Sequence, residues 1–587
     1  MPKNRIQSKS SAKIHTCDSS KRVKSSLPML VPQNSILLWK DSSISRNNKL
    51  PSFSILFDYN YNGSSILVTL KRPLTEPFLE TARKIETKIQ KMLLSHKFWA
   101  TEDFSSESRT SDDFSEAPIT VELPNLTDIE LLTLEDVMDS EKILLVGGIP
   151  YEVIREPSDI STLTCAMKPL VDCPIYPAVD FRQGSLRRFS VSNAEFRCIG
   201  DSYIPSATDS GKLLFLVADL GSQAIVRCAV SKFPIDTVGE PLIFENNIKW
   251  CQMKKPSECI RLVSYNILAD LYLDLSGPQE SLFFPYCPKD YQMYEYRYPL
   301  LLKELLSYNT DICFLQEVDY RMQMRYLKVL FESIGSEMLF SKKQKEVTEG
   351  SVIAFNSQRF ELLFCESYGL ASLLENSCCS DLSKVISSSA VSLEIFTSRP
   401  TTLQVAVLRD RKFDNIIICG NTHLHHNPKH EHLKVFQAVV AVRQLDRIRQ
   451  HFSDSNSMKK IGVLFAGDFN STPDGPVYEI LSTGLLPKSS PCWSLDGNLS
   501  PDDLVLLPSR RSLINLTGTG CTNHTRYRNV NGEDQGFSGC LDYIWTDLAT
   551  LHRIAPRPSH ELLTRYEAIP SRIAPSDHIP LLCEIEF

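Results

Sequence analysis

The chain has 587 residues, of which 42% are hydrophobic and 23% are charged, a globular balance that excludes a wholly disordered or fibrous protein and predicts two or three domains. Its 63 Lys and Arg against 70 Asp and Glu give a net charge of −7, the wrong sign for a protein that coats DNA, although a metal-dependent nuclease site is itself acidic. No run approaches the ~20 apolar residues of a membrane helix, and 17 cysteines without a CxxC pair indicate a reducing compartment, without disulfides or structural zinc.

Residues 1–30 differ in composition from the rest of the chain. They are basic and rich in serine, and Asp18 is the only acid among them. A basic, Ser-rich, acid-poor start is typical of an organelle transit peptide, while a solvated disordered tail has the same composition. Both interpretations stay open, and the first predicts import into mitochondria.

Residues 31–250 predict a smaller β-rich domain. Residues 51–70 read as two strands around a turn, and residues 76–94 have the apolar spacing of a helix. Residues 101–118 are rich in Ser, Asp and Glu, which predicts a disordered acidic linker. Short apolar runs between Pro, Gly, Asp and Ser continue through residues 119–247 and indicate further strands.

Residues 251–587 alternate between strand and helix patterns. The predicted strands are 260–268, 311–318, 351–355, 403–408, 416–419, 461–466, 541–545 and 579–586, and the predicted helices are 300–308, 321–334 and 433–451. Strands separated by helices on a chain of this length predict a layered α/β domain, with two sheets packed between helices.

Polar residues follow or interrupt these apolar strands six times. A single acid at a strand end is more often a turn former or a helix cap, but six such elements in one domain favour a functional site. Their side chains are amides, carboxylates and imidazoles: Asn266, Glu317, His423, Asp468 with Asn470, Asp542, and Asp577 with His578.

This residue set predicts metal-assisted hydrolysis of a phosphodiester. Hard oxygen ligands select Mg²⁺ or Mn²⁺ over zinc, and Glu317 is the leading ligand candidate. Asp468 and Asn470 are two residues apart, so on an extended segment they project to one side and can orient and deprotonate a water. Asp542 and His578 can pair, with the carboxylate fixing the imidazole tautomer.

The ordered set resembles the motifs of the endonuclease/exonuclease/phosphatase superfamily. The early Asn, the Glu after a strand, the His, Gly-Asp-Phe-Asn at 467–470 and Ser-Asp-His at 576–578 appear in family order. The resemblance implies a four-layer α/β sandwich with its site at one end of two packed sheets. It also implies an enzyme that hydrolyses phosphate esters.

The same resemblance implies a role for each residue. Glu317 would ligate Mg²⁺ with Asn266, and Asp577 is a further candidate ligand. Asp468 would be the general base or the acid that positions water, beside Asn470, and both count as candidate metal ligands. His578, held by Asp542, would stabilise charge on the phosphate, and His423 would contact the phosphate.

Within the superfamily, the chain resembles the deadenylase branch. Phe-Pro-Tyr-Cys at 284–287 fits that branch, as do Pro428, five residues after His423, and Phe537, five before Asp542. Residues at these two spacings sandwich an adenine in the deadenylases, and aromatic rings stack on bases.

Within this branch, the chain resembles the 2′,5′-phosphodiesterases of mitochondria. They share Gly-Phe-Ser-Gly-Cys-Leu-Asp-Tyr-Ile at 536–544, whereas His425-His426-Asn427 departs from their pattern. This resemblance implies hydrolysis of 2′,5′-linked oligoadenylates and trimming of 3′,5′ poly(A) tails to 5′-AMP in the mitochondrial matrix. The expected partner is an RNA or oligoadenylate end, without a membrane or an obligate protein partner.

Four alternatives stay open at this point. One is a cytosolic poly(A) deadenylase of the same branch, which would place the protein in the cytoplasm. Another is a phosphatase or phosphodiesterase of the superfamily on a non-nucleic-acid substrate, against which Pro428 and Phe537 speak. A catalytically inactive RNA-binding protein should have lost a core motif residue, and none is lost. Finally, the histidines at 423–432 could form a transition-metal site, which would need three or four converging ligands.

Overall fold

The structure is a computed structural model. It describes residues 35–41, 52–61, 64–99, 120–123, 132–140, 143–155, 159–183, 188–193, 196–199, 202–219, 227–455, 459–494, 499, 501–509, 511–528 and 533–587. The predicted leader at 1–30 and the predicted linker at 101–118 lie outside the described residues.

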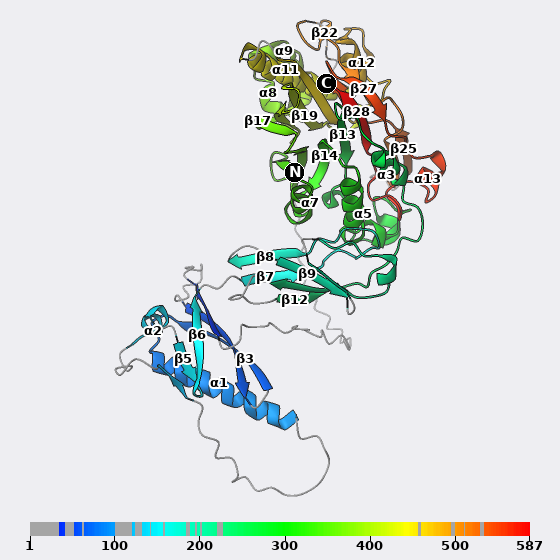
Figure 1. Cartoon of the computed structure of the whole chain (residues 1–587). Coiled ribbons are helices and arrows are strands. Elements are labelled where there is room, and N and C mark those ends of the chain that lie inside the picture. The colour runs from blue at the N-terminus through cyan, green and yellow to red at the C-terminus, as the bar shows by residue number, and fades with distance from the viewer. Residues whose placement is uncertain are drawn as a thin grey trace, which may run out of the picture.

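A six-stranded sheet with the order β3-β2-β1-β6-β5-β4 forms the first part of the chain, and a long helix lies against it (Figure 1). Its elements are β1 (Ser35–Asp41), β2 (Ser52–Tyr61), β3 (Ser64–Pro73), α1 (Phe78–Trp99), β4 (Val121–Glu122), α2 (Leu134–Ser140), β5 (Ile143–Val146) and β6 (Ile149–Arg155). Alternate strand residues such as Phe57 and Val68 are buried with Ile85 and Ile89 of α1. The predicted strand pair and helix are therefore confirmed.

Residues 159–252 add further strands and a short helix. They are β7 (Asp159–Thr164), β8 (Ala178–Gln183), β9 (Arg188–Asn193), β10 (Phe196–Ile199), β11 (Phe215–Asp219), β12 (Arg227–Val230) and α3 (Glu245–Gln252). Met167, Tyr176 and Trp250 share a hydrophobic core with later elements. Ile243 N also donates to Ile573 O at 3.1 Å. This segment therefore packs directly on the C-terminal half.

The C-terminal half is built on two six-stranded sheets packed face to face. The first, ordered β15-β16-β14-β13-β28-β27, contains β13 (Ile260–Asn266), β14 (Ile312–Asp319), β15 (Ser336–Lys342), β16 (Glu349–Asn356), β27 (Thr550–Ile554) and β28 (Leu581–Glu586). The second, ordered β17-β18-β19-β20-β26-β23, contains β17 (Phe360–Gly369), β18 (Thr402–Asp410), β19 (Ile416–His423), β20 (Ile461–Asp468), β23 (Ile514–Asn515) and β26 (Asp542–Thr546).

Apolar side chains of both sheets meet in one core, which includes Leu262, Phe314, Ile417 and Leu464. Helices pack on the outer faces: α5 (Tyr294–Ser307), α6 (Tyr320–Met322) and α7 (Lys328–Ser333) on the first sheet, and α8 (Leu370–Leu373), α9 (Ser380–Ser387), α10 (Ala390–Ser398), α11 (Glu431–Ser455) and α12 (Pro476–Thr483) on the second. The short helices α4 (Lys289–Gln292) and α13 (His560–Thr564) pack in a separate cluster with Ile573 and Ile579. The C-terminal half also contains two short two-stranded sheets, formed by β21 (Leu485–Leu486) with β22 (Leu504–Val505) and by β24 (Asn523–Arg528) with β25 (Asp534–Gly539). The predicted four-layer α/β sandwich is confirmed.

The structure contains elements that were not predicted, such as β15, β27 and α12, and three further differences have an identifiable cause. The helix expected over 321–334 is broken into α6, a π-helical turn at Gln323–Leu327, and α7. Strand β17 was not expected, because it lies at a sheet edge with several exposed residues and no clear alternation. Helices α9 and α10 were not expected either, since their apolar residues are interspersed with runs of serine.

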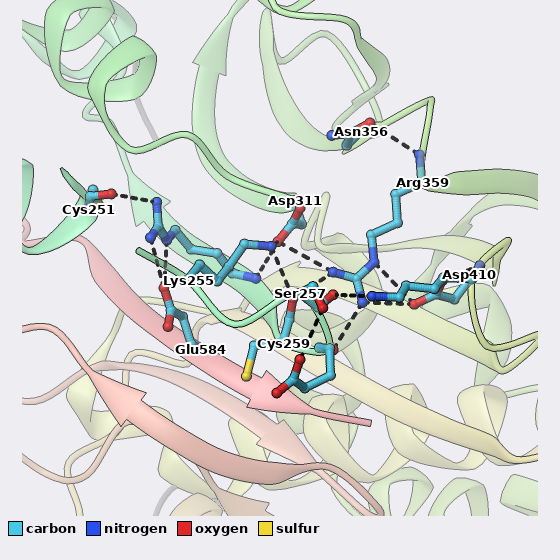
Figure 2. Close-up of polar contacts among 12 residues, drawn as sticks. Cys251, Lys255, Ser257, Cys259, Asp311, Asn356, Arg359, Asp410 and Glu584 are labelled. Carbon is cyan, nitrogen blue, oxygen red and sulfur yellow. Dashed lines mark hydrogen bonds and ion pairs between the residues drawn. The ribbon is translucent and has the colours of Figure 1, made fainter. Parts of the chain in front are cut away.

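An ion-pair network holds the two sheets together at one end of the sandwich (Figure 2). Arg359 donates to Asp410 Oδ2 at 3.0 Å in the second sheet and to Cys259 O at 2.6 Å beside the first. Arg261 of β13 donates to Glu584 Oε1 of β28 at 2.8 Å, with both side chains buried. The Arg359 contacts join the two sheets, whereas the Arg261–Glu584 pair joins two neighbouring strands of the first sheet. Removing one partner of that buried pair would leave an uncompensated charge.

The buried carboxyl of Glu304 should make the stability of the protein depend on pH. Burial raises its pKa from 4.5 to about 8, against the hydrogen bonds of the Tyr308 and Tyr265 hydroxyls. Between these pH values only the unfolded chain releases this proton, so the contribution to stability falls as pH rises, by at most about 1.4 kcal/mol per pH unit. In urea unfolding from pH 4.5 to 8.5, Glu304→Gln should lack this slope.

Glu332→Gln, on the exposed surface of α7, is the matched control and should keep the wild-type slope. Parallel curves for Glu304→Gln and the wild type would contradict the prediction.

Candidate active site

The predicted site residues meet at the other end of the sandwich from the ion-pair network. Asn266, His423 and Asp468 are the last residues of β13, β19 and β20. Asp542 begins β26, which is antiparallel to β20 and directly opposite Asp468. Because parallel strands end on one edge and the antiparallel strand begins there, all four side chains gather at that edge.

The amide of Asn266 joins the carboxylates of the two sheets. Its Nδ2 donates to Glu317 Oε1 at 3.0 Å in its own sheet and to Asp468 Oδ2 at 3.1 Å in the facing sheet. The backbone N–H of Leu268 donates to its Oδ1 at 3.1 Å, which fixes the orientation of the amide. The Ala269 N–H donates to Glu317 Oε2 at 3.0 Å and completes this junction.

Glu317 stands on a β-bulge. The pairing of β14 with β16 shifts register between Leu315 and Val318, and Glu317 has φ +56°. A bulge with a residue in the left-handed region turns a side chain out of the regular alternation, at a cost of about 1–3 kcal/mol. Here it aims the Glu317 carboxylate at the strand ends.

The Gly467–Asn470 turn is shaped by a close backbone approach. A Cβ on Gly467, which has φ +150°, would lie 2.0 Å from Thr422 O of the neighbouring strand, so only glycine fits. Asn470, with φ +49°, donates its backbone N–H to Asp468 Oδ1 at 2.9 Å. Its Nδ2 donates to Leu424 O at 3.0 Å, so this amide braces the turn that carries Asp468.

His578 and Asp542 form a buried pair. His578 Nδ1 lies 2.8 Å from Asp542 Oδ2, and His578 Nε2 lies 3.6 Å from Asp468 Oδ2. Burial disfavours the charged ring, but the carboxylates of Asp542, Asp577 and Asp468 outweigh it and hold the pKa of His578 well above its usual value. The imidazolium form therefore faces Asp468.

His423 has the opposite character. Its Nε2 lies 3.6 Å from Asp468 Oδ2 and its Nδ1 lies 3.8 Å from Glu317 Oε1. Burial and the charges of Lys343 and His578 lower the pKa of His423 well below its usual value, so the ring is neutral. The neutral ring of His423 and the charged ring of His578 thus both face Asp468 Oδ2, each at 3.6 Å.

Sequence reasoning missed two residues of the site. Lys343 Nζ lies 3.4 Å from His423 Nδ1 and forms an ion pair with Glu349 Oε1 at 2.5 Å. Tyr272 Oη also donates to Glu349 Oε1 at 2.7 Å. Neither Lys343 nor Glu349 lies in a motif, and the only signal was the position of Glu349 two residues before the predicted strand 351–355.

The site holds more negative than positive charge. Burial, then Asp577 and Glu349, raise the pKa of Glu317 to about 8, while burial and Asp542 raise that of Asp468 to about 6. The groups are five carboxylates, Glu317, Glu349, Asp468, Asp542 and Asp577, against two cations, Lys343 and His578. Such crowded oxygen donors fit a hard divalent cation, which would stabilise their charged forms.

A second grouping within the site fits a cation less well. Ligand atoms of Asp468, Asp542 and His578 lie within 4.8 Å of one another. However, His578 Nδ1 and Asp542 Oδ2 already bond each other at 2.8 Å, so two of the three groups have a partner. Glu317 therefore remains the leading ligand candidate.

Pro428 and Phe537 lie outside the hydrogen-bonded cluster. Pro428 is exposed at the start of a 3₁₀ turn (Pro428–His430) before α11, and Phe537 is half-buried on β25 opposite Thr525. The strand β24 that pairs with β25 begins at Asn523, which forms a β-bridge with His578. The hairpin that carries Phe537 is therefore rooted at the cluster.

The histidines at 423–432 do not converge as metal ligands. His425 Nε2 meets His430 Nδ1 at 2.9 Å, and His432 Nε2 lies 3.4 Å from Ser392 Oγ. Within the described part of the chain, no three of these rings bring nitrogens within 4.8 Å of one another. The transition-metal alternative therefore loses its geometric basis.

Residues 263–578 match the model of the Endonuclease/Exonuclease/phosphatase family. The chain belongs to this family. A 2′,5′-phosphodiesterase 12 from Homo sapiens is 33% identical over 495 residues, with 77% of each chain covered, and that of Mus musculus is 26% identical with the same coverage. The CCR4-Not complex 3′-5′-exoribonuclease subunit Ccr4 of Candida glabrata is 26% identical, over 60% of this chain and 39% of its own.

Solved structures at low identity also resemble part of this chain. ANGEL2, described as a 2′,3′-cyclic phosphatase, is 18% identical with a TM-score of 0.44, over 56% of this chain and 95% of its own. The human Nocturnin catalytic domain is 18% identical with a TM-score of 0.36, over 57% and 96%. Membership of the endonuclease/exonuclease/phosphatase family makes this protein a hydrolytic enzyme, and its acidic cluster agrees with the divalent-metal dependence general in that family.

Glu317→Gln should weaken binding of Mg²⁺ or Mn²⁺ without unfolding the protein. Without metal, the raised pKa of Glu317, about 8, keeps its carboxyl largely protonated at pH 7, so the neutral amide should leave stability nearly unchanged. Wild-type protein should gain melting temperature with added Mg²⁺, because the folded state binds it, and the variant should need about tenfold more for the same gain.

Glu375→Gln, at an exposed position, is the control and should respond to Mg²⁺ as the wild type does. An unchanged metal response in Glu317→Gln would exclude Glu317 as a ligand.

Proposed function

We propose that this enzyme is a Mg²⁺-dependent phosphodiesterase and 3′-exoribonuclease, which also accepts Mn²⁺. It would hydrolyse 2′,5′-linked oligoadenylates and 3′,5′ poly(A) tails to release 5′-AMP. The observation that carries the proposal is the junction of Glu317 and Asp468 on one amide, beside the Asp542–His578 pair. The names of the relatives, a 2′,5′-phosphodiesterase and a 3′-5′-exoribonuclease, supply the substrate class.

The metal would be held by Glu317. Asn266 points its Nδ2 at the carboxylates and its Oδ1 is bonded to Leu268 N, so we assign it to positioning Glu317 and Asp468. Asp577, next to the pair, adds negative charge and is a further candidate ligand. When bound, the cation would neutralise charge on the phosphate of the substrate.

The chain's own groups would move the protons. Asp468 would orient the attacking water and accept its proton, since its Oδ1 is held by Asn470 N and its Oδ2 faces both imidazoles. The charged His578 would donate a hydrogen bond to a phosphate oxygen, where negative charge grows during the attack. The neutral His423 would contact the phosphate from the other side.

Adenine preference would come from the rim of the site. Phe537 offers a ring face on the hairpin rooted at His578, and base stacking of this kind contributes about 1–3 kcal/mol. Pro428, exposed at the start of its turn, would cover the other face of the base. The partner is therefore a single-stranded RNA or oligoadenylate end.

We further propose that the enzyme acts in the mitochondrial matrix, with the cytoplasm as the alternative. The basic, Ser-rich composition of residues 1–30 supports import. The described residues contain no helix long and apolar enough to cross a membrane.

Asp468→Asn should abolish turnover while preserving the fold. The amide cannot accept the proton of water, and loss of such a base lowers kcat about 10²- to 10⁴-fold. Purified variant and wild type should be compared on 2′,5′-triadenylate with Mg²⁺, with circular dichroism as the check on folding. Exposed Asp502→Asn should retain full activity.

A panel of substrates tests the specificity. With Mg²⁺, 2′,5′-triadenylate and 3′,5′-oligoadenylate should be cleaved faster than oligouridylate or abasic duplex DNA. Equal rates on oligouridylate would refute the adenine preference. Faster hydrolysis of a phosphoinositide or sphingomyelin would favour the second alternative, a family phosphatase on a lipid substrate.

A further inference from the structure

An aromatic pair, with Phe283 exposed and Tyr527 half-buried, lies on two segments that lead to the candidate active site. Phe283 is 48% exposed, and its ring stacks on that of Tyr527 with centroids 5.5 Å apart and 11° between the ring planes. Exposed large apolar side chains are informative when they gather in one place rather than occurring singly. The two rings stack on each other, and the exposed part of the Phe283 ring can extend that stack to a planar ligand.

The first ring is held close to Asn266. The neighbouring Phe284 is buried, meets Phe283 edge-on at 4.8 Å between centroids, and packs in one small core with Leu268. The backbone of Leu268 in turn holds the Asn266 amide. Phe283 is therefore connected, through Phe284 and Leu268, to the amide that joins the two site carboxylates.

The strand that carries the second ring starts beside His578 and Asp542. Tyr527 lies on β24, whose first residue Asn523 bridges to His578. The preceding residue, Thr522, accepts a hydrogen bond from Asp542 N through its Oγ1 at 3.2 Å. The aromatic pair thus joins the segment that packs against Leu268, next to Asn266, with the strand that starts beside His578.

Strand register connects the pair with Phe537. Thr525 pairs with Phe537 and Tyr527 pairs with Gln535, so these four side chains share one face of the β24–β25 hairpin. Diagonal neighbours across two strands lie about 7–8 Å apart, roughly twice the thickness of a stacked base. Phe537, Tyr527 and Phe283 therefore follow one another along a single surface.

We propose that Phe283 and Tyr527 form a stacking platform for a nucleobase upstream of the linkage that is cleaved. This inference rests on the proposed function, in which Phe537 takes the terminal adenine. Phe283 offers no hydrogen-bonding atom, so the platform reads the flat face of a base and accepts any of the four. It makes the enzyme prefer oligonucleotides over a nucleotide bearing a small leaving group.

An experiment that changes both the Phe283 side chain and the upstream bases of the substrate tests the platform. Wild type, Phe283→Ala and Phe283→Trp are compared on 2′,5′-triadenylate and on the same trinucleotide with abasic ribose at both upstream positions. Loss of one stack should raise the KM of Phe283→Ala for triadenylate about 5- to 150-fold, with kcat unchanged. Its KM for the abasic substrate should equal that of the wild type, and Phe283→Trp should restore binding of triadenylate.

Phe413→Ala is the matched control, because Phe413 is 44% exposed on the turn between β18 and β19, at the other end of the sandwich. A KM increase for Phe283→Ala that is equal on both substrates, or a fall in kcat on both, would mean that the pair only anchors the hairpin and would overturn the platform. If wild-type protein cleaves neither substrate, the proposed function fails and the platform with it. Wild-type cleavage with an unaffected Phe283→Ala overturns the platform alone.

Discussion

One amide nitrogen joins the two sheets where the chemistry is placed. Asn266 Nδ2 donates to Glu317 from its own sheet and to Asp468 from the facing sheet, at 3.0 and 3.1 Å. Hydrogen bonds to charged groups are the stronger ones, and at this depth an unpaired carboxylate would be costly. The spacing of the sheets at this edge is therefore tied to the position of one short side chain. Asp, which offers no donor when ionised, could not replace it.

The same edge concentrates charge that a purely structural core would avoid. Burial, and then the charge of neighbouring carboxylates, raises the pKa values of Glu317 and Asp468. Backbone strain adds to the cost, because Glu317 and Asn470 both occupy the left-handed region. Buried strain and like charge in one place are features of sites built for binding and catalysis. At the opposite end, by contrast, Arg261 and Glu584 balance each other inside the sandwich.

Much of this arrangement could be predicted from sequence, and the physical reasons are specific. Asp468 and His423 follow continuous apolar runs, and parallel strands have to bring such ends together. The register shift at Glu317 could not be predicted, since it depends on how β14 pairs with β16, far along the chain. Lys343 was missed because its role arises only from its contacts with His423 and Glu349.

The segment before β13 shapes the site in a way that sequence patterns do not reveal. Composition places a boundary near residue 250, yet Leu242, Ile243 and Phe244 share a core with Ile573 and Ile579. The Arg572 guanidinium donates to Val238 O at 2.6 Å, on the same loop that leads to Asp577 and His578. A loop with few regular hydrogen bonds holds a charged imidazole in place only when both of its sides are packed. The β-rich segment therefore acts as one wall of the loop that carries His578, and the site belongs to both halves of the chain.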